Sequence, residues 1–163
     1  MVNQFREFIQ VLKALDEQKV EYILIGGVAV MLHGMERLTR DIDLFVRMAP
    51  ENIEKLRKAL HSVFEDASIE EITLDELRHY PVIRYGTPDG FYIDIMTRIG
   101  EAFAYEDLKY EMIAYRGTKI KIGTPETLYK LKKDTVRLKD KADALFLKEL
   151  IKEKTKGNSD AGL

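Results

Sequence analysis

The chain has 163 residues, of which 45% are hydrophobic and 33% are charged, with a formal net charge of -2 at pH 7. This size predicts one compact domain with a real core, and the near-neutral charge excludes a protein that attracts nucleic acid over its whole surface. The absence of cysteine excludes disulfides, cysteine nucleophiles and thiolate zinc sites. No stretch resembles a signal peptide or the ~18 apolar residues of a membrane helix, so we expect a cytoplasmic protein with no membrane partner.

The first half of the chain has the spacing of alternating helices and strands. Apolar residues recur every three or four positions in the helical segments, and short apolar runs mark the strands between them. Gly26-Gly27 interrupts the first strand, and Pro50 suits the first turn of a helix. The predicted elements are a helix, a strand, a brief helix, a strand and a helix, over residues 3–19, 22–25, 28–33, 41–46 and 50–64.

The second half of the chain predicts two hairpins and a C-terminal helical region. Turn residues at 86–90 and at Arg116-Gly117 separate two pairs of apolar strands. The predicted elements are a helical turn, four strands and a helical region, over residues 74–79, 81–85, 91–96, 112–115, 119–122 and from about 124. This order predicts an α+β fold in which helices flank a mixed β-sheet, followed by a C-terminal helical segment. We expect one domain over 1–153 and a flexible tail over 154–163.

Three aspartates stand within predicted strands. Asp41 and Asp43 are two positions apart, so on a strand both side chains point to the same face, opposite Ile42. Two carboxylates on one face repel each other unless a positive charge lies between them, and a magnesium ion with oxygen ligands meets that need. Asp94 lies in a later apolar strand. If that strand neighbours the strand of Asp41, three carboxylates converge and hold two metal ions around a transferring phosphoryl group.

Gly26-Gly27 stands at a strand end where a helix opens. Glycine lets the backbone approach a phosphate closely, and the N–H groups of a helix start point towards it. An ordinary strand-to-helix turn explains a lone Gly-Gly as well. Asp-x-Asp also occurs in haloacid-dehalogenase-like phosphatases and in sugar-nucleotide glycosyltransferases, but there an apolar strand precedes the acids. Here the apolar residues 44–46 follow them, so the combination of features favours a nucleotidyltransferase.

The residues around these motifs resemble the polymerase-β-type nucleotidyltransferase superfamily. Its signature is Gly-Gly or Gly-Ser after an apolar residue, then Asp-x-Asp or Asp-x-Glu, then a further acid in a later apolar strand. The string around His33-Gly34 and the segments 124–126 and 130–143 are similar to a bacterial and archaeal branch. That branch includes AbiEii-like toxin nucleotidyltransferases and many uncharacterised relatives. The resemblance covers about residues 5–150.

The resemblance implies a nucleotidyltransferase fold and a mechanism with two Mg²⁺ ions, for which Mn²⁺ is the alternative. It implies that Asp41, Asp43 and Asp94 are the metal site. Asp94 would also help to activate the acceptor hydroxyl, and Gly26-Gly27 would hold the triphosphate. The chain departs from the many members that have serine at the position of Gly27, so backbone N–H groups are left to contact the phosphate there.

Basic residues supply candidate phosphate contacts in two places. Arg37 lies in the loop before Asp41, and arginine offers forked donors to a phosphate. Residues 130–156 carry ten basic side chains against five acidic ones. These basic residues have two interpretations. They create a local positive field that attracts a triphosphate or an RNA backbone, or they only form a solvated helix face. The spacing of Lys130, Lys133 and Arg137 places them on one helical face. The resemblance implies that one of the two lysines meets the nucleotide phosphates.

Two further residues each admit two interpretations. Tyr92 shares the face of Asp94, where it either stacks on a base or is an ordinary half-buried sheet tyrosine. His33 precedes a glycine at a helix end, and we favour capping or packing over catalysis. The three histidines are scattered and there is no cysteine, so no zinc site is expected.

The predicted reaction is in-line attack of an acceptor hydroxyl on the α-phosphate of a nucleoside triphosphate, with release of pyrophosphate. The acceptor stays open between a tRNA end, a protein side chain and a small molecule such as an antibiotic, and the preferred nucleotide is open too. A homodimer or a cognate partner protein is expected to complete the acceptor site. The alternative is a catalytically weak or inactive module that binds a nucleotide or a partner, as one half of a toxin–antitoxin pair.

Overall fold

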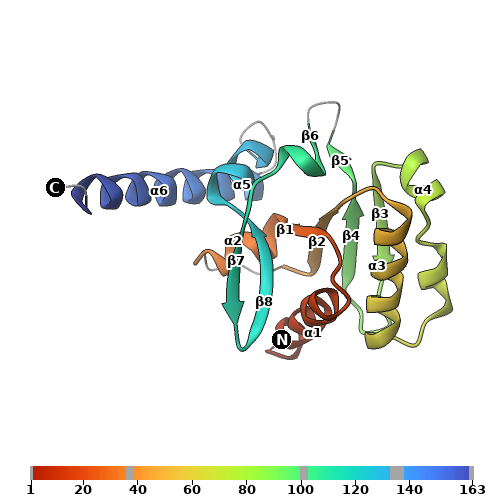
Figure 1. Ribbon diagram of the computed structural model, residues 1–163. Helices are drawn as coiled ribbons and strands as arrows, with labels where there is room; N and C mark the ends of the chain where they lie inside the picture. Colours follow the sequence, from red (N-terminus) through yellow and green to blue (C-terminus); the bar gives the residue numbers. More distant parts are fainter. Residues whose placement is uncertain (1, 36–38, 100–102, 133–137, 162–163) are drawn as a thin grey trace.

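The computed structural model describes residues 2–35, 39–99, 103–132 and 138–161. Its centre is a six-stranded mixed sheet with the strand order β3-β4-β2-β1-β8-β7 (Figure 1). β2 runs parallel to β4 and antiparallel to β1, and β1 runs parallel to β8. The strands of this sheet are β1 Tyr22–Ile25, β2 Asp41–Val46, β3 Val82–Gly86, β4 Tyr92–Met96, β7 Tyr110–Tyr115 and β8 Thr118–Gly123. A separate two-stranded ribbon pairs β5 Arg98–Ile99 with β6 Phe103–Ala104.

Helices flank this sheet, which confirms the predicted α+β class. The helices are α1 Val2–Glu17, α2 Gly26–Leu32, α3 Pro50–Val63, α4 Leu74–His79, α5 Pro125–Lys132 and α6 Leu138–Ala161, with 3₁₀ turns η1 Ala67–Glu71 and η2 Tyr105–Asp107. α1 packs against α3 and β8, whereas α2 packs against β1 and β2 and touches α6. α5 packs against α6 and β8. Within the described ranges, none of these helices is both long enough and apolar enough to cross a membrane.

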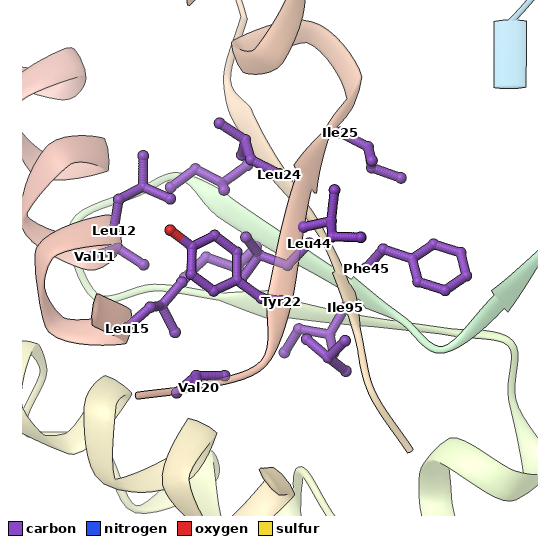
Figure 2. Packing of buried hydrophobic residues seen from close by; sticks show 14 of the residues in the cluster. Val11, Leu12, Leu15, Val20, Tyr22, Leu24, Ile25, Leu44, Phe45 and Ile95 are labelled. Carbon is purple, nitrogen blue, oxygen red and sulfur yellow. The ribbon is translucent and has the colours of Figure 1, made fainter. Parts of the chain in front are cut away.

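The sheet has an apolar face under α1 and an opposite face that carries charge. In the apolar face, side chains of α1 pack on those of β1: Val11, Leu12, Leu15, Tyr22 and Leu24 (Figure 2). The predicted alternation in β2 is confirmed, because Ile42 and Leu44 are fully buried while Asp41 and Asp43 are half-buried. The core therefore holds β2 in a register that turns both carboxylates away from α1.

Several element boundaries differ from the predicted ones, and two of the differences concern α2 and α6. α2 begins at Gly26 rather than at residue 28, directly after β1. α6 continues to Ala161 and projects from the body of the molecule (Figure 1), although we predicted no regular structure after residue 153. Once a long helix is nucleated, each further turn adds a hydrogen bond at little entropic cost, and the lysines and glutamates at 148–154 are good helix formers. The domain limit and the flexibility of the tail stay predictions.

Asn52 ties together three segments at the edge of the core. It lies in the first turn of α3 and is 1% exposed. Its side-chain oxygen accepts from the Glu21 N–H at 2.7 Å, and its amide donates to the carbonyls of Glu21 at 3.0 Å and Arg47 at 2.9 Å. The entry to β1, the exit from β2 and the start of α3 are thereby held in register.

We expect Asn52→Ala to lower the free energy of unfolding by about 3 kcal/mol, because it removes three part-buried hydrogen bonds to the backbone of Glu21 and Arg47. Urea unfolding followed by circular dichroism measures this change. Glu54→Ala is the matched control on the same helix, since the Glu54 side chain is 62% exposed. That control should stay within about 0.5 kcal/mol of wild type. A loss under about 1 kcal/mol in Asn52→Ala would contradict this role.

Candidate active site

The strand pairings bring the three aspartates together. In the parallel pair of β2 and β4, Asp43 lies directly opposite Asp94, and Asp41 lies opposite Tyr92. β1 flanks the same row from the other side, with Ile25 opposite Asp43. Residues opposite each other on neighbouring strands point to the same face of a sheet. The predicted neighbourhood of the Asp41 and Asp94 strands is therefore observed.

Burial increases from the rim of this cluster inwards. The side chain of Asp41 is 30% exposed, whereas that of Asp94 is only 12% exposed. Burial of Asp43, together with the charges of Asp94 and Asp41 and a hydrogen bond to Asp94, raises the pKa of Asp43 to about 7. The positive charge of Lys132 works against that rise. Without a bound cation, the cluster thus retains a proton on Asp43 up to about neutral pH.

Gly26 makes room for the Asp43 carboxylate. A methyl group added at Gly26 would overlap Asp43 Oδ2, and Gly26 has φ +73°, a conformation that side chains disfavour. Gly27 follows in the first turn of α2 and is buried. The glycine pair therefore lies next to the acidic pair, as a shared site would require. His33, at the other end of α2, contacts the Gly123 carbonyl at 2.9 Å, which is the structural role that we favoured.

Arg84 belongs to the cluster, although the sequence analysis did not select it. β3 pairs with β4 so that Arg84 lies opposite Asp94. Its Nε donates to Asp94 Oδ1 at 2.9 Å, and its Nη2 donates at 3.1 Å to Asp94 Oδ2 and also to Asp41 Oδ2. The predicted hairpin contained part of this signal, because it places Arg84 on the same face of the sheet as Tyr92 and Asp94. A turn over 86–90 would set residue 84 opposite Tyr92, and the observed register, with Gly86 opposite Tyr92, sets it opposite Asp94.

Tyr92 lies beneath that guanidinium, 4.7 Å from Arg84 Cζ to the ring centroid. Its ring is 43% exposed and passes within 3.4 Å of where a Cβ of Gly86 would stand. Tyr92 is thus a half-exposed sheet tyrosine, which agrees with the second of our two interpretations, and it also engages a cation. Its stacking on a base stays a prediction.

A lysine of α5 reaches the cluster from its other side. Lys132 is the C-terminal lysine whose charge acts on Asp43, and its Nζ lies 3.0 Å from Asp143 Oδ2 in α6. Both side chains are largely buried, at 13% and 1% exposure. Lys130, one of our two candidates, is instead exposed on α5. A signal for Lys132 existed, because it follows the buried Leu128 by one helical turn.

Three predicted phosphate contacts cannot be placed. Arg37, Lys133 and Arg137 lie outside the described residues. Their roles stay predictions.

The donor chemistry of the cluster fits a hard divalent cation. Carboxylate oxygens are the ligands that Mg²⁺ prefers. Burial, followed by the charges of Asp94 and Asp41, raises the pKa of Asp43, so a cation beside it would stabilise its charged form. As they stand, no three acidic or histidine side chains in the described part of the chain are arranged to hold a metal ion. Two of the three carboxylates engage Arg84 instead.

The raised pKa of Asp43 predicts that the metal-free protein loses stability as pH rises from about 4 to about 7. Over that range the folded state keeps the Asp43 proton, whereas the unfolded chain has released it. The free energy of unfolding therefore falls with rising pH and is flat above this window. With EDTA present, Asp43→Asn should gain about 2 to 3 kcal/mol over wild type between pH 5 and pH 8. Urea midpoints at both pH values measure the gap, and a constant gap would contradict the assignment.

A mixed sheet with an acidic pair and a third acid on neighbouring strands, beside a glycine turn that opens a helix, defines the nucleotidyltransferase class. A family model described as nucleotidyl transferase AbiEii toxin, type IV TA system, matches residues 10–132. The chain belongs to this family of nucleotidyltransferases. A search of curated proteins found no match.

Solved structures confirm the fold. The lincosamide antibiotic adenylyltransferase LnuA, in its lincomycin-bound form, is similar with a TM-score of 0.61 at 18% identity, over 88% of this chain and 95% of that one. An antigenic nucleotidyltransferase-like protein from Paracoccidioides brasiliensis has a TM-score of 0.56 at 21% identity, over 91% and 77%. ANT(2'')-Ia in complex with adenylyl-2''-tobramycin has a TM-score of 0.51 at 16% identity, over 93% and 92%. At these identities the likeness concerns the nucleotidyltransferase fold.

Proposed function

We propose that this protein transfers a nucleoside monophosphate from a nucleoside triphosphate to an acceptor hydroxyl and releases pyrophosphate. The observation that carries the proposal is the pairing of Asp43 with Asp94 across β2 and β4, with Asp41 on the same face and Gly26 against Asp43. This arrangement concentrates carboxylate oxygens, which are metal ligands, next to the glycine backbone at Gly26, where we propose that a phosphate approaches. Membership of a nucleotidyltransferase family supports the same general reaction.

Each residue of the cluster has a proposed task. Asp41, Asp43 and Asp94 would hold two magnesium ions, or manganese in their place, and these ions would neutralise phosphate charge and activate the acceptor hydroxyl. Asp94 is the proposed acceptor of the hydroxyl proton. Gly26 and Gly27 are proposed to let the triphosphate approach the start of α2.

Lys132 is our proposed contact to the departing pyrophosphate. Its support is the effect of its charge on Asp43 and the buried ion pair with Asp143, which restrains the lysine at the edge of the cluster. A restrained cation stabilises developing phosphate charge without the entropic loss of ordering a free side chain. Arg37, Lys130, Lys133 and Arg137 remain further proposed phosphate contacts on the strength of the sequence alone.

The acceptor class is proposed as one of three. LnuA is named a lincosamide antibiotic adenylyltransferase, and ANT(2'')-Ia was solved with adenylyl-2''-tobramycin. These names support small molecules as one acceptor class to be tested, in addition to tRNA ends and protein side chains. The toxin–antitoxin description of the family supports the proposal of a cognate partner protein. A homodimer is the alternative proposed from the sequence alone.

One observation favours a second candidate, a module that binds a nucleotide or a partner without catalysis. Arg84 already neutralises part of the charge on Asp41 and Asp94. A carboxylate cluster balanced by an arginine is a stable arrangement in a protein that never loads a metal.

Label transfer separates the two candidates. The purified protein is incubated with Mg²⁺ and each α-labelled nucleoside triphosphate, with total RNA, the protein alone, a cell extract and an antibiotic panel as acceptors. The control is Asp41→Ala/Asp43→Ala, matched by Asp75→Ala, whose side chain is 75% exposed on α4. Labelled product that disappears only in the double variant supports the transferase and identifies its acceptor class. Magnesium-dependent nucleotide binding without transfer to any acceptor supports the binding module.

A further inference from the structure

Arg84 places a positive charge between two of the three carboxylates. Its Nη2 is 3.1 Å from Asp41 Oδ2 and 3.1 Å from Asp94 Oδ2, and its Nε holds the other oxygen of Asp94 at 2.9 Å. The guanidinium therefore touches a carboxylate of β2 and a carboxylate of β4 at once. A cation shared by Asp41 and Asp94 would have to coordinate the two carboxylates that the guanidinium already engages.

The guanidinium and a divalent cation are then competitors. Both are attracted by the same carboxylates, and they repel each other at short range. A carboxylate oxygen retains a further lone pair after one hydrogen bond, but two positive centres on the same pair of oxygens are electrostatically unfavourable. Binding of a divalent cation between Asp41 and Asp94 therefore requires Arg84 to withdraw.

Arg84 is placed so that it can withdraw without disturbing the core. It lies on β3, which is an edge strand of the sheet, and its side chain is 55% exposed. Its guanidinium stacks on Tyr92, which is itself 43% exposed and lies outside the buried core. An outward rotation of the side chain gives up an exposed ion pair with Asp41 and a part-buried pair with Asp94. The first is a small change in free energy, and a divalent cation at the same carboxylates replaces the charge that Asp94 loses.

We propose that Arg84 is a positioning residue that serves as an internal counter-ion, holding the carboxylates together in the nucleotide-free protein and yielding its place when a divalent cation binds. Free divalent cations then bind weakly, because each must displace the guanidinium. A metal–nucleotide brings additional phosphate contacts and displaces it more readily. This second step rests on the proposed function, whereas the competition with a cation alone does not.

The test measures Mn²⁺ binding by electron paramagnetic resonance, without nucleotide or acceptor. Arg84→Met removes the charge and the donors but keeps an unbranched side chain, and it should bind Mn²⁺ at least about tenfold more tightly than wild type. Arg84→Lys keeps the charge and should stay within about threefold of wild type. Arg116→Met is the matched control, because Arg116 is exposed and stacks on Tyr115. It removes an equal charge remote from the described carboxylates and should leave Mn²⁺ affinity unchanged.

The direction of the change separates competition from a structural role. If Arg84 only held the ligands in place, its loss would weaken Mn²⁺ binding, so an equal or lower affinity in a folded Arg84→Met would overturn the inference. Circular dichroism and thermal unfolding establish that the variant is folded. Absence of Mn²⁺ binding that depends on Asp41 and Asp43 would overturn it as well. Tighter Mn²⁺ binding without label transfer to any acceptor would uphold the inference and count against the transferase.

Discussion

Replacing Asp43 by asparagine is expected to lower kcat/KM for nucleotidyl transfer by at least about 10³-fold, or about 4 kcal/mol of transition-state stabilisation. Asp43 lies at the centre of the row, opposite both Ile25 and Asp94, and directly against Gly26. The amide removes a negative charge that the proposed metal site needs and replaces an oxygen ligand by an N–H₂ group that cannot bind a cation. Label transfer under steady-state conditions measures the loss.

Loss of structure cannot account for this expected result, because the same substitution should stabilise the folded protein near neutral pH. The asparagine side chain in the Asp43→Asn variant carries no charge, so the cost of burying a charge and the repulsion by Asp94 and Asp41, which together raise the pKa of Asp43, are both removed. The combination of higher stability and lost transfer is the signature of a functional carboxylate kept at a cost in stability. Asp75→Asn, on the exposed surface of α4, is the control and should retain full transfer. Transfer within tenfold of wild type in Asp43→Asn would remove Asp43 from the mechanism.

Replacing Gly26 by alanine is expected to lower the free energy of unfolding by about 3 kcal/mol and to reduce transfer by at least about 10²-fold. Two independent causes add in this variant. The φ of +73° is strained for any side chain, and the new methyl group overlaps Asp43 Oδ2. To relieve the overlap, the Asp43 carboxylate must leave the row that it forms with Asp94. A displacement of this size at a reacting group lowers the rate strongly.

Gly117→Ala separates the two causes in Gly26→Ala. Gly117 has φ +81°, but a methyl group there would meet nothing within 4 Å. It therefore carries the backbone strain alone and should lose about 1 kcal/mol with transfer unchanged. Urea unfolding and label transfer on both variants give the comparison. Equal stability losses in the two variants, with transfer intact in both, would show that the contact between Gly26 and Asp43 is unimportant.

The secondary structure was predictable because its signals are local. β1, β2 and α4 have the predicted bounds, and most of the other predicted elements are found within one or two residues of theirs. Alternation in β2 depends only on the two-residue repeat of a strand, so the acidic face of Asp41 and Asp43 was predictable as well. The extension of α6 to Ala161 was not, since the composition of residues 154–163 resembles a tail while helix propagation depends on the turns before it.

By itself, the sequence determined the carboxylate pair, the glycine turn, the third acid in a strand and the class of protein that these features define. Only the tertiary structure decided which charges meet them. Arg84 joins Asp94 through the register of β3 and β4, and Lys132 reaches Asp43 from α5, distant in the chain from both acidic strands. The physical reason is that electrostatic interactions depend on distance through space. That distance is set by strand order and by helix packing. The hydrophobic periodicity of a single segment gives no information about either of them.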